Sequence, residues 1–156
     1  MKKLSIKPFA FISINDNGYI VDVVNDEEKR LSGLSKRTKL EKDHGMLFVF
    51  DKEDKHAFTM KDTYIPLDIV FLDKNLKIVD YIPNAQPLTD KSYKPKEKCL
   101  YVLEISGNDL KDKVEIGDLT KIKFFSTMED ATAHKEEKSL AENLVKYLEK
   151  KVRLLK

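Results

Sequence analysis

Five polar residues beside strongly apolar segments are the best candidates for binding or catalysis. The apolar segments are residues 45–50 and 65–71, and a shorter apolar run surrounds Glu104. The candidate ligand-binding residues are Lys61, Asp62, Thr63, Asp68 and Glu104. A charged residue inside an apolar strand must either face solvent or find a partner. If Asp68 and Glu104 converge, their mutual repulsion would hold a proton on one of them, which suits acid–base chemistry.

Each of these two acidic residues also has a purely structural explanation. Asp68 can cap the loop after Pro66 by accepting backbone N–H bonds. Glu104 can pair with Lys61 or Arg30 across a pocket, or it can face solvent from a half-exposed strand. The sequence leaves these alternatives open, because it does not fix whether the two carboxylates lie together.

No other residue pattern predicts catalysis. His44 and His56 could hold a metal together with Asp68, but their spacing matches no known ligand pattern, which favours surface histidines. Met46 and Met60 fit core packing better than copper binding. The chain has no phosphate-binding glycine loop, no Gly-x-Ser-x-Gly elbow and no Cys/His nucleophile pair. We therefore predict no catalytic residue, no metal site and no cofactor.

The composition predicts one domain without a global affinity for nucleic acid. The 156 residues match the usual size of a single domain, and 41% of them are hydrophobic, which is enough for a core. Charged residues reach 36%, but the net charge of +2 gives no field that would hold nucleic acid or an anionic membrane. The single cysteine, Cys99, excludes an intramolecular disulfide and is expected to be a buried thiol.

Aromatic and β-branched residues between turn residues predict the strands that carry the candidates. A hairpin at residues 9–24 opens the chain, with its turn at residues 15–18. Further strands are expected at residues 45–50, 57–60, 67–72, 76–82, 100–106 and 119–125, and residues 83–98 are expected to form a loop. The pattern predicts a mainly β fold, a small curled sheet or barrel of about seven or eight strands.

A short helix is expected between the second and third strands. Asn25 looks like its N-cap, with Glu28 as the capping-box partner. Leu31 and Leu34 are expected on one face of this helix, and Gly33 is expected to weaken or end it.

The end of the chain has helical periodicity. From Ser139, with Glu142 as a capping-box partner, apolar residues recur at helical spacing, whereas residues 131–138 fit either a helix or a linker. The expected partner-binding stripe consists of Leu140, Leu144, Leu148, Val152 and Leu155. We divide the chain into a β-rich domain at residues 1–126 and a helical extension at residues 127–156. The stripe can dock on its own chain or on another chain, and both alternatives stay open.

The N-terminal residues 1–4, Met-Lys-Lys-Leu, faintly resemble the start of a signal peptide. The apolar stretch that follows is broken by Lys7 and Pro8 and lacks a small-residue cleavage site, so no secretory signal is expected. No segment reaches the roughly 20 apolar residues of a membrane helix. We therefore expect a cytoplasmic protein.

Several motifs, in a fixed order, resemble the domain-of-unknown-function family 192, also called uncharacterised protein family 0127. Residues 58–63 are similar to its aromatic–Trp–Met–Lys–Asn–Thr motif, and residues 29–34 to its Arg-x-x-Gly-Leu motif. Residues 45–50 and 65–68 resemble its Gly-Met-Leu-Phe and Ile-Pro-Leu-Asp segments. The resemblance covers about residues 19–124. It implies a compact β-rich fold with short helices and no established activity.

The chain departs from the family pattern at two positions. Thr59 stands in place of the usual tryptophan, and Asp62 in place of the usual asparagine. If that tryptophan lines a ligand surface in relatives, this chain has lost a large stacking face. Many relatives resemble exported or membrane-anchored proteins, and the helix from Ser139 lies beyond the part that matches.

The leading functional hypothesis is a non-enzymatic binding or assembly module with the C-terminal helix as its contact element. Its partner would be another protein or a second copy of the chain, and a component of a larger complex such as a virion is one form of it. The alternative is a small-ligand-binding protein or enzyme with a polar pocket around residues 61–68 and Glu104. Neither hypothesis includes a nucleic-acid or membrane partner.

Overall fold

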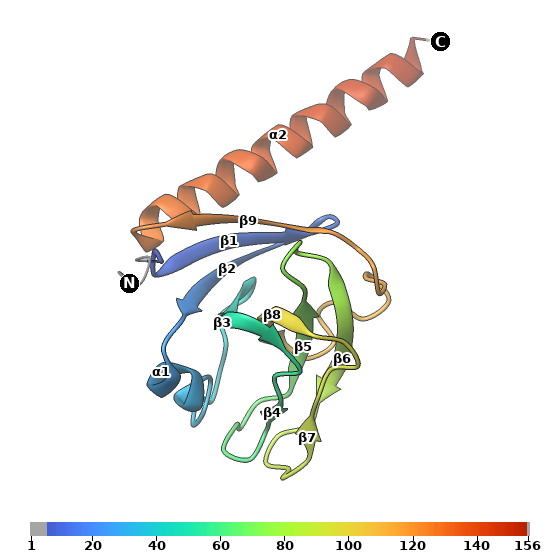
Figure 1. Ribbon diagram of the computed structural model, residues 1–156. Coiled ribbons are helices and arrows are strands. Elements are labelled where there is room, and N and C mark those ends of the chain that lie inside the picture. The colour runs from blue at the N-terminus through green and yellow to red at the C-terminus, as the bar shows by residue number, and fades with distance from the viewer. Residues whose placement is uncertain (1–5, 156) are drawn as a thin grey trace.

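Nine strands and two helices make up the part of the chain that the structure describes, residues 6–155 of a computed structural model (Figure 1). The strands are β1 (Phe9–Ile14), β2 (Asn17–Val24), β3 (His44–Asp54), β4 (Phe58–Thr59), β5 (Leu67–Leu72), β6 (Ile78–Ala85), β7 (Ser92–Tyr93), β8 (Cys99–Ser106) and β9 (Thr120–Phe125). The helices are α1 (Glu27–Ser32) and α2 (Met128–Leu154). Seven strands form one mixed sheet in the order β6-β5-β8-β3-β2-β1-β9, and β4 pairs with β7.

The mainly β class and the two predicted helices are confirmed, but the seven-stranded sheet is open. Within residues 6–155, its edge strands β6 and β9 have no common ladder and approach each other around one isolated bridge, between Lys77 and Leu119. The expected curled sheet or barrel is therefore wrong, because closure requires a continuous ladder between the first and last strands. Residues 83–98 also differ from the expected loop, since they extend β6 and contain β7.

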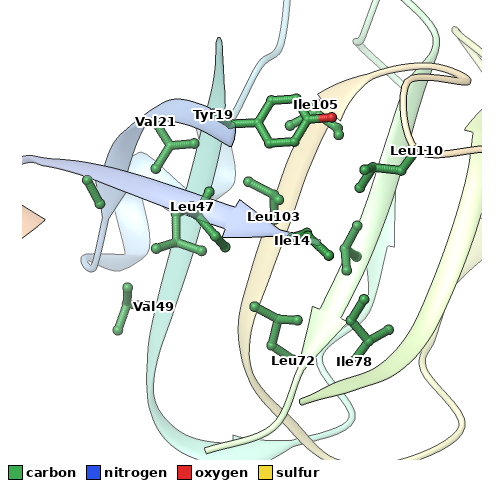
Figure 2. Close-up of a cluster of buried hydrophobic side chains, with 13 residues drawn as sticks. Ile14, Tyr19, Val21, Leu47, Val49, Leu72, Ile78, Leu103, Ile105 and Leu110 are labelled. Carbon is green, nitrogen blue, oxygen red and sulfur yellow. The ribbon is translucent and has the colours of Figure 1, made fainter. Parts of the chain in front are cut away.

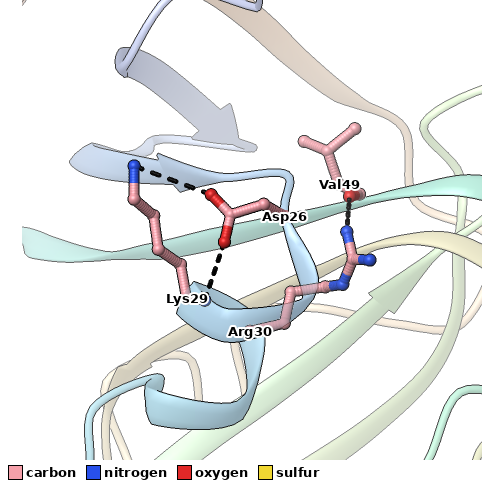
Figure 3. Close-up of polar contacts among 4 residues, drawn as sticks. All are labelled: Asp26, Lys29, Arg30 and Val49. Atoms are coloured by element: carbon pink, nitrogen blue, oxygen red, sulfur yellow. Dashed lines mark hydrogen bonds and ion pairs between the residues drawn. The ribbon is translucent and has the colours of Figure 1, made fainter. Parts of the chain in front are cut away.

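The opening hairpin and a crossover bring α1 to the sheet. In the hairpin of β1 and β2, Asn15 in the turn has a φ of 52°, a left-handed conformation that asparagine tolerates. The following connection carries α1 and returns the chain to β3, which runs parallel to β2. On this route, Arg30 of α1 donates a hydrogen bond of 3.1 Å from Nη1 to the carbonyl oxygen of Val49 in β3 (Figure 3).

The N-cap of α1 is Asp26 and not the predicted Asn25. The Asp26 carboxylate accepts a hydrogen bond of 2.8 Å from the backbone N–H of Lys29, and it pairs with the Lys29 ammonium at 3.6 Å (Figure 3). A charged cap also interacts favourably with the helix dipole, which is a physical reason for the shift by one residue. The predicted shared face is wrong as well, because Leu31 is 80% exposed and the buried Leu34 lies after the helix.

Both faces of the central strands are buried, which explains their uninterrupted apolar sequences. In the antiparallel pair of β5 and β8, Asp68 lies opposite Ile105 and Ile69 lies opposite Glu104, so alternate residues point to opposite faces. One face carries the core cluster of Figure 2, to which the central strands contribute Leu47, Val49, Val70, Leu72, Leu103 and Ile105. The other face carries a second cluster, to which they contribute Met46, Phe48, Leu67, Ile69, Phe71, Cys99 and Val102.

Close contact between β3 and β8 depends on a glycine. A Cβ atom at Gly45 would collide with the backbone carbonyl oxygen of Glu104 and would lie 2.7 Å from Cγ2 of Ile105. Glycine is therefore the residue that lets the two strands pair at this point without separating. Cys99, in the same strand as Glu104, is buried as expected, and burial raises the pKa of its thiol to about 11.

The C-terminal helix α2 begins well before the predicted start at Ser139. Its N-cap is Thr127, whose hydroxyl accepts a hydrogen bond from the Asp130 N–H, so the predicted cap at Ser139 is wrong. Apolar contacts favour the earlier start, because Ala131 is fully buried against Phe11 and other residues of the outer sheet face. Residues 131–138 are thus helical, and the later turns extend beyond the sheet (Figure 1).

Two predictions concern the ends of the chain and membrane insertion. The prediction of no signal peptide falls mainly on residues 1–5, which lie outside the described residues. Neither α1 nor α2 combines the length and the apolar character that crossing a membrane requires, within residues 6–155.

Candidate functional site

Glu104 is a buried carboxyl group without a polar partner. It lies in β8 between Met46 of β3 and Ile69 of β5, and only 5% of its surface is exposed. Within residues 6–155, no hydrogen bond or ion pair involves its carboxyl oxygens, so neither Lys61 nor Arg30 pairs with it, which was one of the two alternatives left open. No enclosed side-chain oxygen of these residues lacks a partner, so the carboxyl oxygens of Glu104 reach the open cavity. Burial alone raises the pKa of Glu104 to about 8. At neutral pH the carboxyl group is therefore mainly protonated.

Glu104 borders an open cavity of about 380 Å³ between α1 and the face of β3 and β8. The lining residues are Glu27, Arg30, Leu31, Ser32, Gly33, Leu34, Ser35, Phe48, Phe50, Ala57, Phe58, Thr59, Thr63 and Glu104. The volume lies at the lower end of the range for small-molecule sites. Apolar walls and few polar groups are also typical of such sites.

Three phenylalanine rings form the apolar wall of this cavity. Phe48 and Phe58 meet edge to face, with ring centroids 5.0 Å apart. Phe58 also makes an edge contact with Phe50 at 6.3 Å. Edge-to-face contacts of this kind fix the rings in one arrangement. The cavity wall is therefore formed before any ligand arrives.

Arg30 is held at the rim of the cavity by two contacts. Its guanidinium carbon lies 5.0 Å from the centroid of the Phe50 ring, and its Nη1 donates to the carbonyl oxygen of Val49. The Phe50 ring also stacks on His56, with centroids 3.6 Å apart. Arg30 is engaged by these contacts and, in the described part of the chain, forms no ion pair with Glu104. This agrees with burial being the cause of the raised Glu104 pKa.

Asp68 lies on the opposite face of the sheet and does not converge with Glu104. The register of β5 and β8 places Asp68 beside Ile105, one residue away from the Glu104 row. The hydrogen-bond donors to its two carboxylate oxygens are Tyr81 Oη, Asn84 N, Asn108 N and Leu110 N, at 2.8 to 2.9 Å. Asp68 thus accepts backbone N–H bonds, but they come from β6 and from the segment after β8, not from the loop after Pro66. With four donors it has no free oxygen for a ligand.

The other predicted candidates divide between the cavity and the surface. Thr63 is buried and lines the cavity together with Glu104. Lys61 and Asp62 are exposed and do not line it. Sequence reasoning named Arg30 only as one possible partner of Glu104 across a pocket, and it missed the three phenylalanines as lining residues. For Arg30, its place in the 29–34 motif was the available signal.

A second cavity, of about 290 Å³, lies between the β1–β2 turn and α2. Its charged lining residues are Lys42, Lys113, Lys135, Lys138, Asp16, Asp43, Asp109 and Glu142. The four positive and four negative charges balance, and Lys135 pairs with Asp43 at 2.9 Å. The formal charges of this lining therefore cancel and do not select a ligand by the sign of its charge.

The chemistry available at the Glu104 cavity is binding and proton exchange. The ionisable side chains in its lining are Glu27, Arg30 and Glu104. Glu104 has no second buried acid or base beside it, so the lining contains no acid–base pair. Residues 6–155 also contain no group of three His, Cys, Asp or Glu side chains arranged to hold a metal ion.

The comparisons with known proteins agree with this fold. The model of the family DUF192 (Uncharacterized ACR, COG1430) matches residues 11–122. A solved protein from Sinorhizobium meliloti 1021, named a "putative transcription regulator", is 29% identical with a TM-score of 0.69 over 76% of this chain and 96% of its own. A protein of unknown function from Novosphingobium aromaticivorans DSM 12444 is 25% identical, with a TM-score of 0.66 over 72% of this chain and 83% of its own. No curated protein matches the chain.

Proposed function

The chain belongs to the DUF192 family, whose members are uncharacterised, and from this starting point we propose that it is a small-molecule-binding protein with its site at the Glu104 cavity. The observation that carries the proposal is Glu104, a residue only 5% exposed, whose carboxyl group borders the cavity and makes no hydrogen bond or ion pair among the described residues. Burying a carboxyl group without a partner is costly, and such groups concentrate at functional sites.

Binding without catalysis fits the lining best. Glu104 is the only buried ionisable group in it, whereas Glu27 is exposed and Arg30 is half-buried. A catalytic site would need a nucleophile with a base, or a paired acid and base, in mutual reach. The net charge of +2 likewise gives no support for transferring the regulator label of the Sinorhizobium protein to this chain as a DNA-binding function.

Blocking the mouth of the cavity tests this function. In ¹H–¹⁵N NMR spectra, small aromatic fragments are expected to shift the amide signals of residues around Glu104. Ala57 is exposed and lines the cavity, so Ala57→Trp places an indole at its mouth and should weaken fragment binding at least about tenfold. Ala133→Trp, on an exposed position of α2, is the matched control and should bind normally. The proposal would be contradicted if the fragments shift amide signals away from Glu104, or if the signals around Glu104 still shift in Ala57→Trp.

Self-association through α2 is a second candidate function, supported by the exposed apolar residues of this helix. Leu140 follows Ala131 by nine residues, two and a half turns at about 3.6 residues per turn, so it lies on the side opposite to the buried anchor. The predicted stripe is 50–86% exposed, so it has no cover from its own chain. Within the described residues, this favours contact with another molecule over docking in cis.

The spacing of the apolar residues favours a second copy of the chain as the partner. Positions separated by four, three, four and three residues are occupied by Ala141, Val145, Leu148, Val152 and Leu155. Such a heptad pattern forms the seam of a coiled coil. The a positions are Val145 and Val152, and the d positions are Ala141, Leu148 and Leu155. β-Branched residues at a with leucine at d favour two parallel strands, and hence a dimer.

The mass in solution tests the dimer. The chain should have a concentration-dependent mass approaching twice its 18.1 kDa in analytical ultracentrifugation. Deleting residues 139–156, or the double change Leu148→Lys and Val152→Lys, should give a monomer because lysines at a and d positions bury unpaired charge. Asn143→Lys changes a position outside the seam and should leave the dimer intact. A wild-type chain that stays at 18.1 kDa at every concentration would rule the dimer out.

A further inference from the structure

The proposed small-molecule function can be taken one step further, to the chemical class of the ligand. We propose that the cavity binds an amine: a small molecule with one ammonium group, which pairs with Glu104, and an apolar body, which packs against Phe48, Phe50 and Phe58. This inference rests on the proposed ligand-binding function and adds the charge and the shape of the ligand to it.

The charges around the cavity favour a cation. Two of its three ionisable lining residues, Glu27 and Glu104, are acidic. The third, Arg30, already stacks on Phe50 and donates to the Val49 carbonyl oxygen. An anionic ligand would be repelled by the ionised carboxylate of Glu104 and could meet only its protonated form, as the acceptor of a single hydrogen bond. An ammonium group instead supplies the partner that Glu104 lacks.

The aromatic wall favours the same class of ligand. Ring faces carry partial negative charge and attract cations, and they also cover an apolar body well. In this cavity the rings are fixed by edge contacts of 5.0 Å between Phe48 and Phe58 and 6.3 Å between Phe50 and Phe58. A ligand therefore finds a preformed apolar surface beside a single acidic group. With about 380 Å³ of space, the body is limited to about one aromatic ring with a short chain.

Binding of an ammonium group should release a proton from the protein. In the empty site, burial raises the pKa of Glu104 to about 8, so the carboxyl group holds a proton at neutral pH. The ammonium ion pairs with the carboxylate form, so Glu104–COOH and R–NH3⁺ give the ion pair and one free H⁺. A neutral ligand that accepts a hydrogen bond from the protonated carboxyl group would release none. Proton release thus distinguishes the two classes.

Calorimetry with a matched set of probes tests the inference. The probes are 2-phenylethylamine, its neutral analogue 2-phenylethanol and the anion 3-phenylpropanoate, titrated into the full chain in phosphate and in Tris buffer. We expect the amine to bind best and to release about one proton at pH 7. Its affinity should rise about tenfold per pH unit below about pH 8 and level off above it, because only the ionised fraction of Glu104 binds.

The variant Glu104→Gln should weaken amine binding at least about tenfold and abolish both the proton release and the pH dependence. Binding of 2-phenylethanol should change little. Glu97→Gln, at an exposed position, is the matched control and should behave like the wild type. The wild-type pH profile tests the inference without any variant, so a folding defect in Glu104→Gln would not affect it.

Two results would overturn the inference, and they differ in what they say of the proposed function. If 2-phenylethanol or 3-phenylpropanoate binds at the cavity as well as the amine does, or if amine binding releases no proton, the ligand class is wrong and the small-molecule function stands. If none of the three probes binds and aromatic fragments shift no signals around Glu104, both fail.

Discussion

Replacing Asp68 with asparagine is expected to lower the free energy of unfolding by about 4 kcal/mol, a large part of the stability of a small domain. The carboxylate is fully buried and accepts hydrogen bonds from Tyr81 Oη and from three backbone N–H groups. An asparagine amide has an NH₂ group in place of one carboxylate oxygen. This group cannot accept a hydrogen bond, so it points a donor at the donors that Asp68 satisfies. The shape is unchanged, which leaves lost hydrogen bonding as the cause.

Urea unfolding monitored by circular dichroism measures this loss. Asp62→Asn provides the control, because Asp62 is exposed six residues away and its side chain makes no hydrogen bond within residues 6–155. Its substitution should change stability by less than about 0.5 kcal/mol. Equal effects of the two substitutions would show that the Asp68 network does not stabilise the fold. Of the three backbone donors, Asn84 lies near the end of β6, and Asn108 and Leu110 lie in the segment after β8, so these amides should also lose hydrogen-exchange protection in Asp68→Asn.

The second large effect is a fall in stability with rising pH that disappears in Glu104→Gln. Burial raises the pKa of Glu104 from 4.5 to about 8 in the folded chain. Below pH 4.5, folded and unfolded chains both hold this proton, and above about pH 8 both have released it. Between these values the unfolded chain has lost the proton and the folded chain keeps it. The free energy of unfolding should therefore fall by up to about 1.4 kcal/mol per pH unit in this window.

Unfolding curves across this window, for the wild type and two variants, measure the effect. Glutamine does not titrate, so the stability difference between Glu104→Gln and the wild type should grow as the pH rises from 4.5 to about 8. Glu97→Gln, at an exposed position, should follow the wild type. A constant difference between Glu104→Gln and the wild type would mean that Glu104 titrates normally. The proton release proposed for amine binding would then lose its source.

The strands could be predicted from sequence because each carries a local signal. Aromatic and β-branched runs predicted the bounds of β1, β5 and β8 to within about one residue, and Asn15 marked the first turn. The helix starts were harder, because the choice of cap depends on contacts beyond the local pattern. Asp26 is the N-cap of α1 in place of Asn25, because its negative charge interacts favourably with the helix dipole. Helix α2 starts at Met128 because Ala131 is buried against the sheet.

The candidate site could be predicted only in part, because its composition depends on strand register. Asp68 and Glu104 are 36 residues apart, and a pairing shifted by one residue would have placed them on the same face. Sequence patterns do not fix a register of this kind. Arg30 and Phe58 reach the cavity from segments distant in sequence, through the crossover after β2 and the short strand β4. Glu104 was a candidate because a charged residue stands out in an apolar run, and Thr63 because it lies in a polar loop between two apolar strands.

The open sheet leaves two edge strands, β6 and β9, which within the described residues are joined by backbone hydrogen bonds only around their first residues. The outward N–H and C=O groups beyond that point could recruit strands from other molecules. A closed barrel would have no such edges. Here β9 carries the exposed lysines Lys121 and Lys123, and β6 carries the exposed Pro83, which has no N–H to donate. Charge on one edge and a missing donor on the other both disfavour intermolecular strand pairing. The chain can therefore resist edge-to-edge aggregation during and after folding, without needing closure.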